Sequence, residues 1–350
     1  MKILVVTDKK YLNPYTCELM NHMSERLNNG KVVVGISEFW NSDATFDIIH
    51  FQWIEELFDW DDYNMEKVVS LLERIDHFKN RGASVVCTIH NLYPHKLLLE
   101  QGCEMYMKVF QKTDLFVHLG KISKKIFAEV YGGELVKSKR HVVIPHGLYD
   151  SFEKNVDRNS ARSYFGINEK DFVLLAFGRI RNFEEERLIF DAFRALKTKR
   201  KKVIIPWYNF SNQRLGRLIQ KVRLGFTKKV IAKSGYIKKK MVPYYFAASD
   251  IVLIPRINIL NSGNLFLGFF YEKVVTGPGT GVVGEILKET GNPYFIPGDK
   301  RSLSLAINNA KKLAESSNKG HENFLYANER FNWGIISEMH IKEYESIIKT

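Results

Sequence analysis

FVLLAFGRIRNFEEERLIFDAFRAL, residues 172–196, decides the fold of the second half of this 350-residue chain. An apolar run is followed by Gly178-Arg179-Ile180-Arg181 and then by apolar residues at helical spacing. A short strand that is apolar throughout is typical of a parallel sheet covered on both faces. The stretch therefore predicts one strand–loop–helix unit of a doubly wound α/β domain.

The same alternation runs along the whole chain. In the second half we expect further strands and helices, the strands at 202–208, 230–236 and 250–255 and the helices at 184–197, 214–225, 240–248 and 302–315. In the first half we expect strands at 2–8, 31–36, 46–53, 83–90, 114–119 and 141–146, with helices at 14–27, 64–81 and 121–131. Strands separated by helices indicate a parallel, doubly wound sheet in each half.

Pro145-His146-Gly147 and the polar stretch 150–160 separate the two halves. We predict a first Rossmann-like domain at 1–147 and a second at 148–332, with a final helix at 333–350 that packs back toward the first. Two such domains leave a cleft between them. Because ligands bind outside the carboxyl ends of parallel strands, we expect loops of both domains to face that cleft.

The composition excludes several classes of protein. With 45% hydrophobic and 26% charged residues the chain is globular, and it contains no run of about 18 apolar residues. MKILVVTD at the start leads directly into a strand, without the pattern of a secretion signal. Cys17, Cys87 and Cys103 lack metal-ligand spacing. We expect a cytoplasmic protein whose thiols are reduced and buried.

The net charge of +13 is concentrated in one window. Residues 1–150 carry 18 basic and 20 acidic residues, whereas residues 151–350 carry 34 and 19. Residues 191–240 alone hold 16 basic residues and one acid, Asp191. Basicity this local indicates a polyanionic partner or an anionic membrane surface. The predicted helix 214–225, with apolar residues on one side and basic residues around it, suits such a surface, although it also suits packing on the sheet.

Three features of the second half are candidates for binding a phosphate group. Asn261-Ser262-Gly263-Asn264 opens an apolar helical segment, where free backbone N–H groups bind anions, although an ordinary helix cap has the same residues. Gly277-Pro278-Gly279-Thr280-Gly281 follows a strand-like run and precedes Glu285 in the next helix, a pattern that suits a loop facing a nucleotide and equally suits a tight turn. Arg179 and Arg181 follow a strand and are able to clamp a diphosphate, although a single arginine is more often an ordinary surface residue.

In the first half, candidate residues follow two of the predicted strands. His90 and His95, in TIHNLYPH (88–95), are candidates for proton transfer or sugar binding, although a single histidine is more often structural. Trp53, Glu55 and Glu56 close another strand, where an aromatic ring beside carboxylates suits a sugar, although Trp53 equally suits the core.

In this order and spacing, the motifs resemble the GT-B glycosyltransferases, closest to the bacterial polysaccharide branch related to family 4. The resemblance rests on Asn13-Pro14-Tyr15, FDIIHFQW (46–53), TIHNLYPH, VIPHGLYD (143–150), FGRIRNFEEERLIFDAFRAL (177–196) and YFAASDIVLIPRINILNSG (245–263). It departs from family 4 in two places. Glu184 stands where a lysine is usual, with Arg181 as a substitute charge, and the usual pair of glutamates is missing from NSGNLFLGFF.

The resemblance implies a GT-B fold and an enzyme that moves a sugar from a nucleoside-diphosphate sugar, UDP- or GDP-linked, without a metal or other cofactor. The donor would be bound in the second domain by Gly178, Arg179, Arg181, Asn261, Ser262, Gly263, Asn264 and Glu285. The acceptor, a glycan or polyprenyl-linked glycan of bacterial surface polysaccharide synthesis, would be bound in the first domain by Asn13, Tyr15, Trp53 and Tyr93. The catalytic candidates are His90, His95 and Glu55, and retention or inversion stays open.

Two other hypotheses remain. The basic window with Trp207, Tyr208 and Phe210 has the composition of an RNA-binding surface, but the chain has no RNA-binding motif, so a nucleic-acid partner is the less favoured prediction. The departures from family 4 leave room for a glycosyltransferase relic without activity. The favoured prediction is a cytoplasmic enzyme that docks at the inner face of the plasma membrane.

Overall fold

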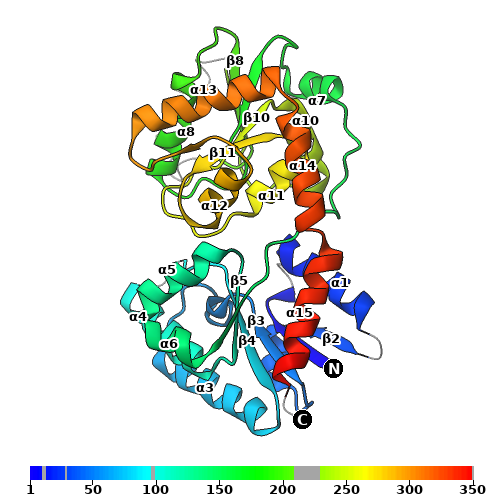
Figure 1. Ribbon diagram of the computed structural model, residues 1–350, viewed down its shortest axis with the longest axis vertical. Coiled ribbons are helices and arrows are strands. Elements are labelled where there is room, and N and C mark those ends of the chain that lie inside the picture. The colour runs from blue at the N-terminus through cyan, green and yellow to red at the C-terminus, as the bar shows by residue number, and fades with distance from the viewer. Residues whose placement is uncertain (10–12, 28–29, 96–98, 209–228, 349–350) are drawn as a thin grey trace. The chain divides into compact units, whose positions relative to one another are not determined.

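The computed structural model describes residues 1–9, 13–27, 30–95, 99–208 and 229–348 (Figure 1). The chain divides into two compact units, Met1–Gly147 with Phe331–Thr350, and Leu148–Arg330. Within the described residues, each unit contains one six-stranded sheet whose strand pairs are all parallel. The predicted helix 214–225 lies outside the described residues.

The first unit has the strand order β2-β1-β3-β4-β5-β6. Its strands are β1 (Lys2–Val6), β2 (Lys31–Val34), β3 (Ile48–Phe51), β4 (Ser84–Ile89), β5 (Leu115–His118) and β6 (Arg140–Val143). Its helices are α1 (Pro14–Arg26), α2 (Ile36–Asn41), the 3-10 helix η2 (Ile54–Phe58), α3 (Met65–Asn80), α4 (Leu99–Lys112), α5 (Lys121–Tyr131), α6 (Gly133–Ser138) and α15 (Trp333–Ile347). Side-chain caps fix several helix starts: Asn13 accepts from the N–H of Tyr15 in α1, and Asn64 from that of Glu66 in α3.

Helix α15 comes last in the chain but belongs to the first unit, where it packs on α1 (Figure 1). Trp333 at its start is 1% exposed, and a Cβ on Gly147 would lie 2.3 Å from the indole of Trp333. Tyr344 is buried, and its hydroxyl oxygen lies 2.7 Å from Nδ1 of His50 in β3. The core of this unit is therefore completed by residues nearly 300 positions away in sequence.

The second unit has the strand order β12-β11-β10-β7-β8-β9. Its strands are β7 (Phe172–Leu175), β8 (Lys201–Ile205), β9 (Val230–Ala232), β10 (Ile251–Leu253), β11 (Val274–Pro278) and β12 (Tyr294–Phe295). Its helices are α7 (Arg158–Phe165), α8 (Phe183–Ala195), η3 (Lys239–Met241), α10 (Val242–Ala248), α11 (Gly263–Phe270), α12 (Gly281–Glu289), α13 (Lys300–Ser316) and α14 (Lys319–Arg330).

Helices cover both faces of this second sheet. The buried side chains of α8 and α13 join Val274 of β11 in one apolar cluster. The next residue, Val275, points to the opposite face, where it packs on Gly268 of α11 so closely that a Cβ on the glycine would lie 2.5 Å away. The sheet is therefore doubly wound, as the sequence predicts. None of the helices in the described part of the chain combines the length and apolar character that a membrane crossing needs.

Several predicted boundaries were wrong. The polar stretch 150–160 is only partly a linker, because Asp157 caps α7 and the helix begins at Arg158. Residues 277–281 do not form one loop: Gly277 and Pro278 end β11, and Gly281 begins α12. Helices α2, α4, α6 and α14 were not predicted. Glycine and proline mark turns in sequence, but here strand pairing and packing override that signal.

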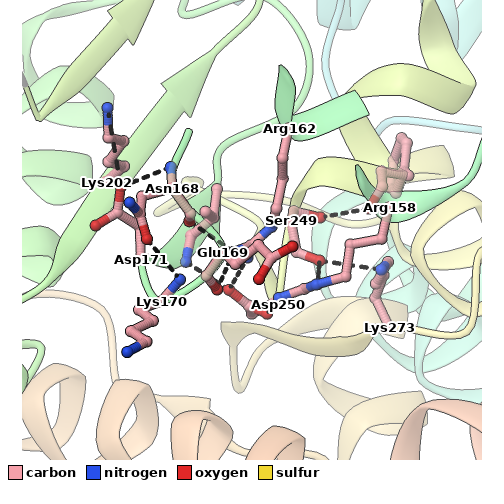
Figure 2. A network of polar contacts seen from close by, with 12 residues as sticks. Arg158, Arg162, Asn168, Glu169, Lys170, Asp171, Lys202, Ser249, Asp250 and Lys273 are labelled. Atoms are coloured by element: carbon pink, nitrogen blue, oxygen red, sulfur yellow. Dashed lines mark hydrogen bonds and ion pairs between the residues drawn. The ribbon is translucent and has the colours of Figure 1, made fainter. Parts of the chain in front are cut away.

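An ion-pair network, part buried and part exposed, joins the amino ends of β7 and β10 (Figure 2). Asp250, which precedes β10, pairs with Arg158 and with Arg162, the latter at 2.9 Å, and it also accepts from the backbone N–H of Val173 at 2.6 Å. Arg162 is 1% exposed and donates as well to the carbonyl oxygens of residues 168 and 169. Its guanidinium stays charged in the interior because these oxygens surround it. The network ties α7 to the sheet.

The strand orders locate the ligand edge of each sheet. In the first sheet, β2 is added on one side of β1 and the later strands from β3 onward on the other side. In the second sheet, β8 and β9 are added on one side of β7 and the strands from β10 onward on the other. The order in which strands are added therefore switches between β1 and β3 and between β7 and β10. In open parallel sheets ligands bind outside the carboxyl ends of the strands at such a switch point. Residues 7–8 and 52–56 follow β1 and β3, and residues 176–181 and 254–256 follow β7 and β10.

Candidate functional site

The loop after β7 is shaped by Gly178 and Asn264. Gly178 has φ +95°, a backbone conformation that residues with a side chain rarely adopt. A Cβ there would lie 3.0 Å from Nδ2 of Asn264, and this same nitrogen donates to the carbonyl oxygen of Phe177 at 2.8 Å. The second residue of α11 is thereby fixed to the end of β7, so the loop and the start of α11 form one surface.

A buried ion pair between Arg256 and Glu185 fixes the backbone of the loop after β7. Arg256 donates through Nη1 to Glu185 at 2.6 Å and through Nη2 to the carbonyl oxygen of Arg179 at 3.0 Å. Glu185 also accepts from the backbone N–H of Arg181 at 2.7 Å. Burial lowers the pKa of Arg256 to about 10, which leaves it charged at neutral pH. Within Glu184-Glu185-Glu186, where the sequence departs from family 4, Glu185 therefore anchors the loop.

With the backbone fixed in this way, the side chains of Arg179 and Arg181 are directed to solvent: both residues are exposed. The Arg179 guanidinium lies 5.9 Å from the ring centroid of Trp207, an arrangement that allows a cation–π contact. Two guanidinium groups two residues apart on a rigid loop are well placed to bind phosphate oxygens.

The amino end of α11 presents backbone N–H groups at the same edge. Ser262 occupies the capping position, but its side chain makes no capping hydrogen bond. A Cβ on Gly263 would lie 2.1 Å from the hydroxyl oxygen of Tyr149, so a larger residue does not fit there. Asn261 and Ser262 are partly buried. The first backbone N–H groups of a helix have no partner within the helix. Where no side chain caps them, they are suited to bind an anion.

Helix α12 starts in a similar way. Thr280 makes no side-chain cap, and Gly281 has φ +60° and packs so tightly that a Cβ would lie 2.3 Å from the carbonyl oxygen of Ile259. Glu285 is the fifth residue of α12 and is partly buried. The helix thus starts four residues before the predicted segment EILKET, and Glu285 is displaced from its first turn.

In the first unit, His90 lies in a buried aromatic cluster. It is 7% exposed and stacks on Trp53 at 4.0 Å between ring centroids, while Tyr15 contacts it edge-on at 5.1 Å. Burial, reinforced by the neighbouring His146, holds the pKa of His90 well below its ordinary value. The imidazole is therefore neutral at neutral pH.

A chain of hydrogen bonds fixes the tautomer of His90. Its Nε2 lies 2.9 Å from Oε1 of Gln52, so the ring donates there. The amide nitrogen of Gln52 lies 3.1 Å from Nε2 of His50, which is also 2.8 Å from the hydroxyl oxygen of Thr88. Nδ1 of His50 lies 2.7 Å from the hydroxyl oxygen of Tyr344. Burial likewise lowers the pKa of His50 well below its ordinary value. His90 is thus held in one orientation by Gln52, which contacts His50 of β3, and His50 in turn contacts Tyr344 of α15.

His95 and Glu55 form a different arrangement. Nδ1 of His95 lies 2.9 Å from Oε1 of Glu55, whose carboxylate is fully buried and also accepts from the hydroxyl of Tyr106. The His95 side chain is 32% exposed. A buried carboxylate at Nδ1 keeps the proton there and makes Nε2 the basic nitrogen.

Glu56 adds a second carboxyl group at the switch point between β1 and β3. It accepts from the hydroxyl of Thr7 at 2.7 Å and from the backbone N–H of Asp8 at 3.1 Å. Burial raises the pKa of Glu56 to about 7, although these two hydrogen bonds oppose the shift. A carboxyl group with this pKa exchanges its proton near neutral pH.

The four predicted acceptor residues differ widely in accessibility. Asn13 caps α1, and Tyr15 is 1% exposed against His146 and Trp333. Trp53 is 9% exposed, whereas Tyr93 is 43% exposed. Of this set, only Tyr93 offers an open aromatic surface.

A small cavity lies beside His90 at the ends of β3 and β4. Its volume is about 10 Å³, room for about one water molecule. The lining includes Gln52, Trp53, Thr88 and His90. The cavity does not admit a sugar.

Sequence reasoning missed several residues of these sites. Arg256 and Gln52 each follow a buried strand, and their place at a strand end is the signal that could have found them. Glu56 is predicted with Glu55 as a carboxylate beside Trp53, but no sequence pattern indicates its burial. Tyr106 lies in α4, and no local pattern connects it with Glu55. In the basic window, Tyr208 is 2% exposed and so offers no face for a base to stack on, while Phe210 lies outside the described residues.

Comparison with known proteins identifies the fold. No protein-family model and no curated protein matches the chain. Among solved structures, HepE from Anabaena in complex with UDP-glucose matches with a TM-score of 0.72 and 15% identity, covering 99% of this chain and 100% of that one. Sucrose-phosphate synthase from Thermosynechococcus elongatus matches at 0.74 and 12%, covering 99% of each chain. A putative UDP-N-acetylglucosamine 2-epimerase from Listeria monocytogenes matches at 0.59 and 10%, covering 99% and 96%.

The chain therefore has the GT-B fold, and this part of the prediction is confirmed. At these identities the likeness concerns the fold. One fold can host several reactions, so the function has to be argued from the sites.

Proposed function

We propose that the chain is a glycosyltransferase that moves a sugar from a UDP-sugar to a carbohydrate acceptor. The observation that carries the proposal is the carboxyl edge of the second sheet. There, two exposed arginines on a rigid loop and a helix start without a side-chain cap lie next to each other, joined by Asn264. The UDP-glucose complex of HepE, which has the same fold, supports a uridine nucleotide as the donor.

The chemistry explains why these groups suit a donor. Breaking the bond between sugar and diphosphate leaves negative charge on the leaving group. Arg179 and Arg181 supply positive charge, and the N–H groups of α11 from Gly263 onward supply fixed dipoles. These groups stabilise the leaving diphosphate, so we propose transfer without a metal. Glu285 is proposed to contact the ribose or the sugar.

The first unit is proposed to bind the acceptor, with His95 as the general base. Its Nε2 takes the proton of the attacking hydroxyl, while Glu55 stabilises the imidazolium that forms. His90, neutral and fixed, is proposed to donate or accept a hydrogen bond at the sugar. A base on the acceptor side favours inversion of configuration.

We further propose that the acceptor is a glycan or polyprenyl-linked glycan of surface polysaccharide synthesis, reached at the cytoplasmic face of a membrane. The described exposed cations Lys197, Lys199 and Arg200 lie before β8, at the amino edge of the second sheet. That edge is opposite the proposed donor site, so these charges suit a separate anionic surface. Co-sedimentation with anionic vesicles but not neutral ones supports docking; equal recovery in both supernatants contradicts it.

The donor proposal is tested with UDP and UDP-glucose. We expect UDP to raise the melting temperature of the wild type, and UDP-glucose to be slowly hydrolysed without added metal. Arg179→Ala should weaken UDP binding by about tenfold or more, because a charge-assisted hydrogen bond is lost. Arg187→Ala, which removes another exposed arginine, one that pairs with Asp191 within α8, is the control and should bind UDP as the wild type does. Equal UDP affinity in Arg179→Ala and wild type contradicts the donor site.

A further inference from the structure

The turn that follows η2 has an unusual backbone. Asp59 and Trp60 have φ +50° and +74°, and neither is glycine. Bulky residues rarely adopt this left-handed region, and two in succession need support from their surroundings. The backbone N–H of Trp60 donates to the carbonyl oxygen of Glu55 at 2.9 Å, which holds the turn closed.

The turn places the indole of Trp60 against the proposed base. The ring centroids of Trp60 and His95 lie 5.5 Å apart at an interplanar angle of 72°. His95 is bound in turn to Glu55. One short segment, residues 55–60, therefore positions both the imidazole and the indole beside it. A T-shaped contact covers at most one face of the indole, and Trp60 is partly exposed.

We propose that Trp60 is the platform on which the terminal sugar of the acceptor stacks, with its attacking hydroxyl toward His95. This inference rests on the proposed function. Trp53, the aromatic residue predicted for this role, is 9% exposed and already stacked on His90, so its faces serve the core. Trp60 combines partial exposure with direct contact to the base. The strained turn keeps the ring in place before the sugar arrives.

The charges around Trp60 define the class of sugar. Asp59, Asp61 and Asp62 are all exposed and lie within two residues of the ring, and Lys67 pairs with Asp62. Carboxylates accept hydrogen bonds from sugar hydroxyl or ammonium groups and repel other carboxylates. We therefore expect the terminal acceptor sugar to be neutral or an amino sugar, and a uronic acid to bind more weakly.

The test measures sugar binding directly by saturation-transfer NMR, with methyl β-glucoside and methyl β-glucuronide as probes. Trp60→Gly removes the ring and suits the left-handed backbone, so it should fold at least as well as the wild type. We expect it to weaken glucoside binding by about tenfold or more, whereas Trp60→Phe should retain most of the affinity. The glucuronide should bind the wild type more weakly than the glucoside.

Glucoside affinity equal in Trp60→Gly and wild type overturns the platform, and so does equal binding of the two sugars by the wild type. UDP affinity separates this inference from the proposed function. If Trp60→Gly binds UDP normally but loses the glucoside, both stand. If the wild type binds the glucoside through Trp60 and does not bind UDP, the proposed function fails and the sugar site remains.

Discussion

At the scale of single residues, Glu56 shows how the end of a strand controls a protonation equilibrium. Its carboxyl group is 9% exposed beside Thr7 and Asp8 at the carboxyl end of β1, and burial raises its pKa to about 7. In the unfolded chain a glutamate releases its proton near pH 4.5. The folded protein therefore binds one proton more than the unfolded chain between about pH 4.5 and 7.

This difference predicts the effect of Glu56→Gln. Because Glu56 loses its proton in the folded protein only near pH 7, its contribution to the free energy of unfolding of the wild type should fall as pH rises from 4.5 to 7 and then level off. Glutamine keeps the accepting oxygen and removes the titration. The difference in free energy of unfolding between the variant and the wild type should therefore shift in favour of the variant by up to about 3 kcal/mol from pH 4.5 to pH 8. Urea unfolding at both pH values measures it. Glu129→Gln, at an exposed position, is the control, and an equal Glu56→Gln effect at both pH values contradicts the prediction.

At the scale of elements, the network in Figure 2 attaches α7 to the amino ends of β7 and β10 through one carboxylate. Asp250 binds Arg162, which is buried, and Arg158, whose side chain is 46% exposed. The two pairs look alike in a sequence but differ in solvation. Removing the partner of a buried charge is costly, whereas an exposed pair contributes little.

We therefore expect Asp250→Asn to lower the free energy of unfolding by about 3–5 kcal/mol, because the Arg162 guanidinium keeps its burial and loses its counter-charge. Arg158→Ala should cost at most about 1 kcal/mol. Urea denaturation measures the free energy of unfolding of both variants, each of which changes an ion pair of Asp250. Similar losses for both would show that the network does not depend on burial.

At the scale of the whole molecule, the first unit is discontinuous in sequence: residues 331–350 close it after the chain has formed the second unit. Trp333 and Tyr344 are both fully buried in the first unit, and Tyr344 meets His50 in β3. The stability of the first unit thus depends on a helix that the second unit does not need.

Truncation after Arg330 should expose this dependence. We expect the first unit to lose its cooperative melting transition, since burial of a single tryptophan is worth about 3–5 kcal/mol and α15 buries several large residues. The second unit should keep its transition and its stabilisation by UDP. Differential scanning calorimetry with and without UDP separates the two. Tyr344→Phe is the mild control, with a cost of about 1–3 kcal/mol. A truncated chain that keeps both transitions contradicts this account.

The sequence predicts the strands well because their apolar runs are long and uninterrupted, as in β1, β4 and β7. It predicts the loop 178–181 and the helix start at 263 because glycine and asparagine have distinct backbone roles. It fails at α12, where Gly281 begins a helix by packing on a distant carbonyl group. It also names Trp53 and not Trp60 as a candidate for the acceptor, because local sequence does not tell which aromatic residues are covered.

The sequence by itself determined the doubly wound architecture and the strand ends from which the candidate sites are built, because periodicity and turn chemistry are local properties of the chain. Only the tertiary structure decided how the side chains pair: Glu55 with His95, Glu185 with Arg256, and Tyr344 with His50. These partners lie 40, 71 and 294 residues apart. Their burial and protonation depend on which strands and helices come together, and that is settled by the packing of the whole unit.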